Sequence, residues 1–171
     1  GFALALLLLA MSGGLAVLLP RNFAFVLALY FALTMSYSRR LKQLVLLDVF
    51  FLAGLYTMRL IAGHEASGLA YSFWLLAFSM FIFLSLALVK RYLELFGLRQ
   101  EIKTNAKARG YTANDLEMVA SLGTASGYLS ALVLALYVNS SEVRVLYQHP
   151  TLLLLVCPLL LYWISRVWLI A

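Results

Sequence analysis

Charged residues are scarce in this sequence of 171 residues, since only 12% are charged and 64% are hydrophobic. Soluble domains carry about 25% charged and about 45–50% apolar residues, so a soluble domain is excluded and the chain must be embedded in a membrane. Basic residues outnumber acidic ones by thirteen to seven. They lie between apolar runs and form no separate basic domain, which argues against nucleic-acid binding.

Cysteine is limited to Cys157, which lies inside an apolar run. A single cysteine excludes a disulfide within the chain, and no Cys and His residues have the spacing of a metal site. The sequence also lacks a Gly-rich phosphate loop, a Ser/His/Asp order and a paired-carboxylate pattern. No residue is marked as a nucleophile, so the catalytic residues stay unassigned and any chemistry must depend on positioning and charge.

Long apolar runs are what the sequence does contain. A helix needs about 20 apolar residues to cross the hydrocarbon core, and six segments of roughly this length are predicted to span it: Phe2–Leu19, Phe23–Ser38, Val45–Ala62, Phe73–Val89, Met118–Val138 and Leu152–Ile170. These segments are too uniformly apolar for barrel strands. We therefore predict an all-α fold, a polytopic transmembrane helical bundle that forms a single domain over residues 1–171. We expect this domain to be an internal piece of a longer protein, truncated at both ends.

One polar stretch, Lys90–Glu117, interrupts the apolar runs. It holds six of the thirteen basic residues and four of the seven acids. Alternation of the spans places it on the same side as residues 39–44, so that nine basic loop residues share one side. The positive-inside rule predicts that this side is cytoplasmic. We expect residues 90–117 to form a cytoplasmic loop that caps the bundle.

The two basic loops contain candidate ligands for a phosphate or diphosphate group, because Lys and Arg pair strongly with phosphate oxygens. The candidates are Lys42, Lys90, Arg91, Arg109 and Tyr111. The alternative is that these charges only fix the orientation of the protein in the membrane. The pattern of residues leaves both interpretations open.

Two charges lie inside the third predicted span. Asp48 and Arg59 are eleven residues apart, which is three helical turns, so they share one face at a separation of about 16 Å. Charges within spans usually face the interior of a bundle, which makes both residues candidates for lining a polar cavity. The alternatives are that Asp48 complements the helix dipole and that Arg59 extends its charge to the membrane surface.

Two further features have a structural interpretation. Gly123 and Gly127 stand four residues apart in the fifth span, a spacing that lets two helices approach closely. We predict ordinary packing inside one bundle rather than a dimerisation face. His64 and Glu65 lack the second histidine of a zinc helix motif, and we predict a solvated turn there.

Several motifs resemble one known family. They are Tyr-Ser-x-x-Leu-Lys at Tyr37–Lys42 with Asp48 and Arg59 in the span that follows, Leu86–Leu95, Arg109–Tyr111 with Asp115, Ser121–Tyr128, and Cys157–Arg166. Together they resemble the UbiA-type prenyltransferase superfamily over nearly the whole chain. The resemblance is to a bacterial subgroup that is also similar to decaprenyl-phosphate phosphoribosyltransferases.

This resemblance implies a nine-helix bundle in the bacterial cytoplasmic membrane, of which six spans are present here. It implies a lipid-lined cavity, an active site facing the cytoplasm, and Mg²⁺ that holds a diphosphate under two polar capping loops. The first aspartate-rich motif of the family would precede Gly1, so most metal ligands are expected outside this chain. The usual second motif is replaced by Glu94, Glu101 and Asp115, of which Glu94 and Asp115 are weak candidates for the metal.

The function expected from the resemblance is that of a membrane-embedded transferase, which moves a prenyl group from a polyprenyl diphosphate lipid to an acceptor. The first alternative is phosphoribosyl transfer from phosphoribosyl diphosphate to a polyprenyl phosphate. The second is a membrane transporter or scaffold without catalysis, in which Asp48 and Arg59 would line a solute path. As a fragment, the chain is expected to be inactive alone.

Overall fold

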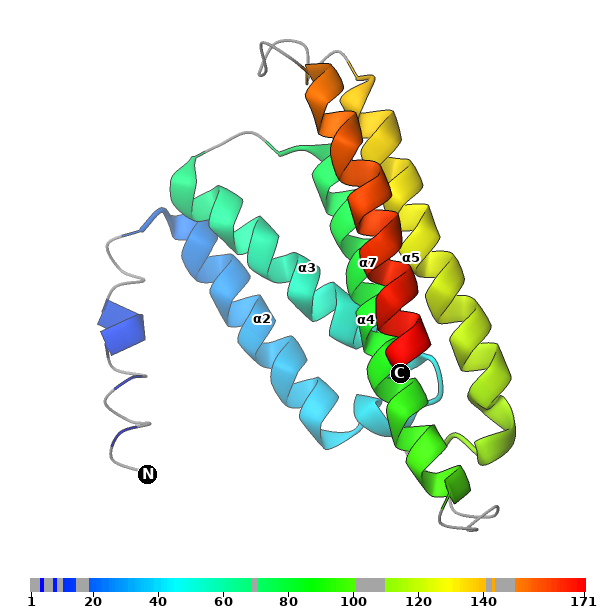
Figure 1. Ribbon diagram of the computed structural model, residues 1–171. Coiled ribbons are helices and arrows are strands. Elements are labelled where there is room, and N and C mark those ends of the chain that lie inside the picture. The colour runs from blue at the N-terminus through cyan, green and yellow to red at the C-terminus, as the bar shows by residue number, and fades with distance from the viewer. Residues whose placement is uncertain are drawn as a thin grey trace.

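The computed structural model describes most of the chain as helix. The residues that it describes are 4, 8, 11–14, 19–68, 71–100, 110–140, 143 and 150–171. Over this part the chain is all-α and contains no strand, which confirms the predicted fold class. Figure 1 shows the long helices lying beside one another as a bundle.

Each long helix overlaps one of the predicted spans. They are α2 (Arg21–Arg39), α3 (Leu47–Ser67), α4 (Phe73–Gln100), α5 (Leu116–Val138) and α7 (Val156–Ile170), with the short helices η1 (Leu41–Gln43), η2 (Ala113–Asp115) and η3 (Pro150–Leu155). Of the first predicted span, residues 4, 8, 11–14 and 19 are described, and all of these except Leu19 are helical. Within the described residues, three segments are long and apolar enough to cross a membrane: Phe73–Arg99, Leu116–Val138 and Leu152–Ile170. The chain is a multi-pass membrane protein.

Helix α4 lies at the centre of the packing. It contacts α3 on one side and α5 on the other, while α2 packs on α3 and α7 packs on α5. The core includes Val49 and Ala53 of α3, Leu88 and Leu95 of α4, and Val119 of α5. These side chains join α3, α4 and α5 at one end of the bundle.

The glycines of α5 provide the close approach that the sequence predicted. A Cβ atom at Gly123 would lie 2.1 Å from Cζ2 of Trp168, and one at Gly127 would lie 2.6 Å from Cγ2 of Ile164. Trp168 and Ile164 belong to α7, so the small residues admit α7 against α5. Gly123 and Gly127 therefore serve packing within one bundle, as predicted.

Helix α4 extends eleven residues beyond the predicted end of its span. It continues through Lys90 to Gln100, and Leu95 in this extension is fully buried in the core. The polar stretch Lys90–Glu117 is therefore partly helix, and it joins α5 at Leu116. Residues 101–109, including the predicted phosphate ligand Arg109, lie outside the described residues.

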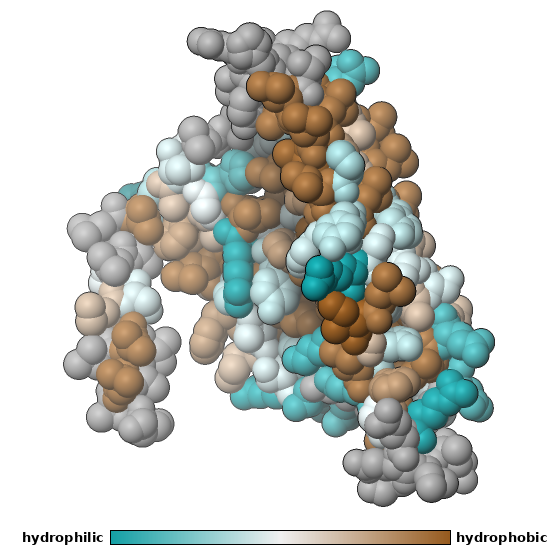
Figure 2. All heavy atoms as spheres, viewed as in Figure 1, coloured by the Kyte–Doolittle hydropathy of each residue, from teal (hydrophilic) through white to brown (hydrophobic). Residues whose placement is uncertain are grey.

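The segment between α2 and α3, which holds Arg40 and Lys42, lies at the same end of the bundle as the last part of the polar stretch. Residues 40–46, between α2 and α3, and residues 110–115, which lead into α5, are both at the lower end of Figure 1. In Figure 2 hydrophilic surface gathers at this end, whereas hydrophobic surface covers much of α5 and α7 above it. We call this end of the bundle the basic end.

The opposite end carries the pair predicted to form a solvated turn. His64 and Glu65 lie in the last turns of α3, which ends at Gly68 in the left-handed conformation with φ of 69°. The His64 ring stacks on Tyr71 at a centroid distance of 5.3 Å, and the Tyr71 hydroxyl donates a hydrogen bond to Glu65. This hydrogen bond raises the pKa of Tyr71. The pair is half-buried at a helix end, and its described contacts are local.

Candidate functional site

The segments 40–46 and 110–115 contact each other directly. A Cβ atom at Gly110 would lie 3.0 Å from the carbonyl oxygen of Gln43 and 2.9 Å from Cγ2 of Val45, so only glycine admits this approach without rearrangement. Gly110 also has φ of 88°, a conformation that glycine adopts readily. The backbone N–H of Leu46 donates a hydrogen bond of 2.7 Å to the Tyr111 hydroxyl. The prediction that the two loops face one another agrees with these contacts.

A buried charge network lies beneath this contact. The Tyr111 hydroxyl donates to Oδ1 of Asp48 at 2.8 Å, and the Arg91 guanidinium donates to Oδ2 of the same carboxylate. Arg91 also pairs with Glu94, one turn further along α4. Asp48, Arg91 and Tyr111 are 0%, 2% and 1% exposed. We call Asp48, Arg91, Glu94 and Tyr111 the Asp48 network; it ties α3, α4 and the start of α5 together.

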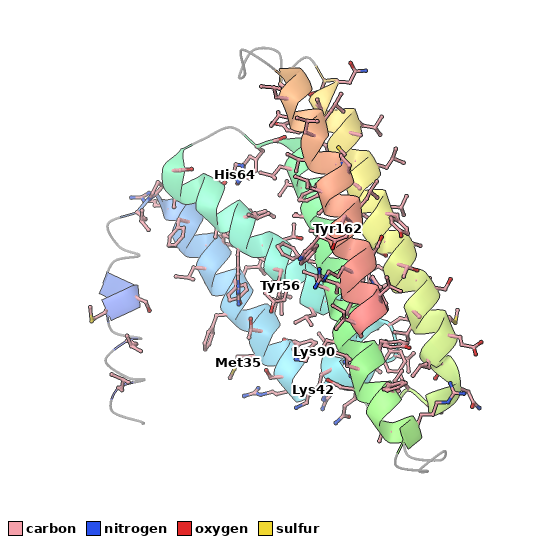
Figure 3. The ribbon with its side chains drawn as sticks, in the orientation of Figure 1. Met35, Lys42, Tyr56, His64, Lys90 and Tyr162 are labelled. Carbon is pink, nitrogen blue, oxygen red and sulfur yellow. The ribbon has the colours of Figure 1, made fainter. Side chains whose placement is uncertain are left out.

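The network changes the interpretation of two predicted phosphate ligands. Arg91 and Tyr111 are buried and directed at Asp48, with the Arg91 carbon Cζ 5.4 Å from the centre of the Tyr111 ring. Neighbouring Lys90 is exposed, and Lys42 in η1 is half-buried. Figure 3 labels both lysines near the basic end. The structure therefore leaves Lys42 and Lys90 as the accessible members of the described candidates.

Burial raises the pKa of Tyr111 from its ordinary 10.0 to about 12, and the hydrogen bond to Asp48 acts in the same direction. A raised pKa in the folded state means that the neutral phenol stabilises the fold. This contribution is fully present below pH 10 and is lost as the pH rises through about 12.

We therefore predict that Tyr111→Phe lowers the free energy of unfolding by about 1–2 kcal/mol, because Asp48 and the Leu46 N–H each lose a hydrogen bond. Thermal unfolding in detergent would measure this loss. The difference from the natural protein should be constant between pH 6 and pH 9 and should shrink above pH 10. A difference that changed between pH 6 and pH 8 would contradict this assignment.

The Lys90 side chain borders a pocket between α3 and α4. The pocket has a volume of about 270 Å³ and is lined by Leu52, Tyr56, Phe83, Leu86, Ala87 and Lys90. Its walls are largely apolar, so the ammonium group is its only described lining charge. Low-dielectric walls strengthen the attraction between a cation and an anion. The pocket can hold an anionic group at Lys90, with an apolar or aromatic group of the same ligand beside the other lining side chains.

The weak metal candidates have other partners. Glu94 pairs with Arg91, while Oδ2 of Asp115 accepts hydrogen bonds from the backbone N–H of Thr112 at 2.8 Å and from its hydroxyl at 3.0 Å. Thr112 and Asp115 thus form a capping box before α5. Among the described residues, no three His, Cys, Asp or Glu side chains come together in a way that could hold a metal ion. The described donor set does not fit the magnesium that the resemblance implies.

The two charges of α3 occupy different surroundings. Asp48 is fully buried, whereas Arg59 is exposed and donates from Nε and Nη2 to the Tyr30 hydroxyl of α2 at 3.1 and 2.9 Å. The carbon Cζ of Arg59 also lies 4.9 Å from the centre of the Tyr56 ring. Neither residue is among those lining the α3–α4 pocket, although Tyr56 connects Arg59 to it. Cavity lining by Asp48 and Arg59 stays a prediction.

Tyr30 and Tyr56 are the residues that sequence reasoning missed. Tyr56 precedes Arg59 by three positions, and residues three or four apart lie on the same helix face. Phe83 and Lys90 are likewise seven apart in α4, on one face. The helical spacing around Arg59 and Lys90 would have indicated Tyr56 and Phe83 as neighbours on the same helix. It would not have indicated Tyr30, which belongs to α2 and contacts Arg59 of α3.

In comparison with known proteins, the chain matches no protein-family profile. It is 40% identical over 174 residues to an uncharacterized protein, y4nM, of Sinorhizobium fredii, and 34% identical over 169 residues to the nodulation protein NoeC of Azorhizobium caulinodans. These alignments cover 100% and 97% of the chain, but 33% and 54% of the relatives.

A more distant relative has a named activity. The chain is 33% identical over 122 residues to the decaprenyl-phosphate phosphoribosyltransferase of Mycolicibacterium smegmatis, which covers 71% of this chain and 38% of that protein. The chain thus spans between a third and about half of the length of the relatives that it matches. It is distantly related to a transferase.

Proposed function

We propose that this chain is the membrane-embedded part of a UbiA-type transferase that acts on a polyprenyl phosphate or diphosphate lipid. The observation that carries the proposal is the basic end, where the segment that holds Lys42 meets the segment before α5, and where Lys90 borders an apolar-walled pocket. The distant relationship to a decaprenyl-phosphate phosphoribosyltransferase supports it. In a bacterial cytoplasmic membrane the basic end would face the cytoplasm.

The name of that relative favours phosphoribosyl transfer over transfer of a prenyl group. A phosphate oxygen of the lipid would attack the anomeric carbon of phosphoribosyl diphosphate, a new carbon–oxygen bond would form, and diphosphate would leave with the electrons of the broken bond. Lys42 and Lys90 would neutralise the charge that gathers on the leaving group. Prenyl transfer from a polyprenyl diphosphate to an acceptor is the second candidate, since it places the same diphosphate charge at the same lysines.

The Asp48 network would act by positioning. Arg91 directly follows Lys90 and is held by Asp48 from α3 and by Glu94. Tyr111 joins the same carboxylate to the segment before α5. The network fixes α4 against the start of α3 and the segment before α5, so Lys90 is presented to the pocket from a rigid helix. Magnesium stays a prediction from the resemblance, and no step is assigned to it.

Product analysis would test the proposal. The complete protein in membranes would receive polyprenyl phosphate with phosphoribosyl diphosphate, or polyprenyl diphosphate with an aromatic acceptor. Mass spectrometry separates a lipid-linked sugar phosphate from a prenylated aromatic compound. The first product supports phosphoribosyl transfer, and the second supports prenyl transfer. Neither product, together with solute flux in proteoliposomes that lack any prenyl substrate, would replace the proposal with a transporter.

We predict that Lys90→Gln raises the KM for the diphosphate-bearing substrate about tenfold, since one charge-assisted contact is lost. Arg99→Gln is the matched control, because Arg99 is an exposed cation of the same helix two turns further on. Steady-state kinetics of the complete protein would measure both variants. An unchanged KM for Lys90→Gln would remove Lys90 from the site.

A further inference from the structure

A groove between α2 and α3 lies on the opposite side of α3 from the Lys90 pocket. It has a volume of about 280 Å³, and its lining residues are Leu33 of α2 and apolar residues of α3 from Leu47 to Met58. Gly54 lines this groove, whereas Tyr56 lines the Lys90 pocket. Residues two apart point to nearly opposite sides of a helix. The α2–α3 groove is therefore a separate space, to which the proposed reaction gives no role.

The α2–α3 groove has the dimensions of one hydrocarbon chain. From Leu47 to Met58 it extends about 16 Å along α3, close to half the thickness of a hydrocarbon core of about 30 Å. Spread over this length, the volume of about 280 Å³ gives a mean cross-section of about 18 Å². A single chain of carbon atoms, which contact their neighbours at about 3.5–4.0 Å, fits this width. A helix with its side chains is wider, at about 10–12 Å.

Gly54 forms a notch in the α2–α3 groove. A Cβ atom at this position would meet nothing within 4 Å among the described residues. Glycine is unfavourable inside a helix, and at Gly123 its presence is explained by the close approach of α7. No described contact explains it at Gly54. The notch instead keeps space open on a face of α3 where the described helices do not need it.

Two arginines without a role in the proposed reaction lie where α2 meets the basic end. Arg39 is the last residue of α2 and Arg40 follows it, and both are exposed. Arg40 is seven positions from Leu33, so the two share one face of α2, and Leu33 lines the groove. The sequence contains no acidic residue before Asp48, which is buried against Arg91. Neither arginine forms an ion pair with a described residue, so both are available to an external anion.

The start of α3 is suited to contact with lipid. Residues 44–47 are four consecutive apolar residues, and all four are exposed. They follow Arg40 by four positions, in the segment that joins α2 to α3 at the lower end of Figure 1. Cations beside exposed apolar side chains are typical of segments at a membrane surface, where the cations attract anionic head groups. The mouth of the groove therefore lies where a lipid head group would meet Arg40.

We propose that the α2–α3 groove binds one acyl chain of an anionic phospholipid, whose phosphate is held by Arg40 with Arg39 beside it. The lipid is a bound companion of the protein and undergoes no reaction. Unpaired arginines favour an anionic head group over a zwitterionic one. A groove only half as long as the hydrocarbon core is thick favours an acyl chain over a long polyprenyl chain. The inference is independent of the proposed transferase function.

Titration of the complete, delipidated protein in detergent with phosphatidylglycerol tests this site, with native mass spectrometry to count the bound lipid. Gly54→Leu is expected to lower the affinity about tenfold, because the new side chain takes space from the acyl chain. Gly63→Leu is the matched control. Gly63 belongs to the same helix, its Cβ atom would also meet nothing within 4 Å, and it does not line the groove. It should leave the affinity unchanged.

Arg40→Gln tests the head group without changing the groove. It is expected to lower the affinity for phosphatidylglycerol about fivefold, since one cation near the head group is lost. The weaker binding of phosphatidylcholine with the same acyl chains should not change. Arg21→Gln is the control, because Arg21 is an exposed arginine at the opposite end of α2, and it should alter neither affinity.

Equal affinity of the unaltered protein for the two phospholipids, or wild-type affinity in Gly54→Leu, overturns the inference. If Gly54→Leu does not fold, wild-type affinity in Arg40→Gln overturns it alone. Displacement of phosphatidylglycerol by an equal amount of polyprenyl phosphate would also overturn it, because the groove would then be a substrate site. A change of oligomeric state in Gly54→Leu, with lipid binding intact, would assign the groove to a helix of a second copy. None of these results bears on product formation, so the proposed function is tested separately.

Discussion

Arg91→Met is expected to lower the free energy of unfolding by about 3–5 kcal/mol, since removing one member of a buried ion pair leaves the other charge without compensation. Asp48 is fully buried, and after the substitution the Tyr111 hydroxyl would be its remaining side-chain donor among the described residues. The carboxylate cannot reach water without separating α3 from α4. Thermal unfolding of the purified protein in detergent would measure the loss.

The double variant Asp48→Leu with Arg91→Met separates this explanation from a loss of packing. Apolar side chains of similar volume often replace a buried ion pair at little cost, so the double variant should recover much of the stability lost in Arg91→Met. Arg99→Met is the control on the same helix, and we expect no measurable change because Arg99 is exposed. A double variant less stable than Arg91→Met would contradict the uncompensated charge as the cause.

Gly123→Ala is expected to destabilise the bundle by about 3 kcal/mol, at the upper end of the usual cost of overpacking. The new methyl group would lie 2.1 Å from Cζ2 of Trp168 and 3.0 Å from Cβ of Leu88. The indole cannot move freely, because its N–H donates to the Ser85 hydroxyl at 3.2 Å, and that hydroxyl donates to the Gly123 carbonyl at 2.7 Å. Displacing the ring therefore also breaks the hydrogen bond between α7 and α4.

Gly97→Ala is the matched control for this prediction. A Cβ atom at Gly97 meets nothing within 4 Å, and the residue is exposed in α4. Alanine is favoured over glycine in a helix by about 1 kcal/mol, so Gly97→Ala should leave the melting temperature unchanged or raise it. Adding Trp168→Leu to Gly123→Ala should recover part of the loss. Equal effects of Gly97→Ala and Gly123→Ala would show that α7 does not pack on α5 in this way.

Most of the fold could be predicted from hydropathy, because the apolar runs mark the helices directly. The end of α4 could not, since hydropathy reports the boundary of the lipid and not the end of a helix. After Lys90 the sequence becomes polar, yet Leu95 is fully buried in the core and helps to hold the helix together to Gln100. A tertiary contact with α3 and α5 thus extends a helix that the pattern ended at Val89.

The candidate site was predicted only in its residue types. Basic residues were assigned to phosphate by charge, and charge alone does not distinguish Lys90, which is exposed, from Arg91, which is buried against Asp48. Asp48 and Arg91 are 43 positions apart, so no local spacing indicates that they pair. Helical periodicity did place Asp48 and Arg59 on one face. Their surroundings differ because Asp48 contacts Arg91 and Tyr111, whereas Arg59 contacts Tyr30 of α2.

The backbone at Leu46 stores conformational strain at the basic end. Leu46 has φ of 64° and ψ of −42°, and the N–H of Leu47 donates to the carbonyl of Val45 at 2.8 Å, the pattern of a classic γ-turn. Such a conformation costs roughly 1–3 kcal/mol for a residue with a side chain. The hydrogen bond from Leu46 to Tyr111 holds the turn in this form. Parting of the two segments would remove this hydrogen bond, so the strained turn at Leu46 and the contact between the segments depend on each other.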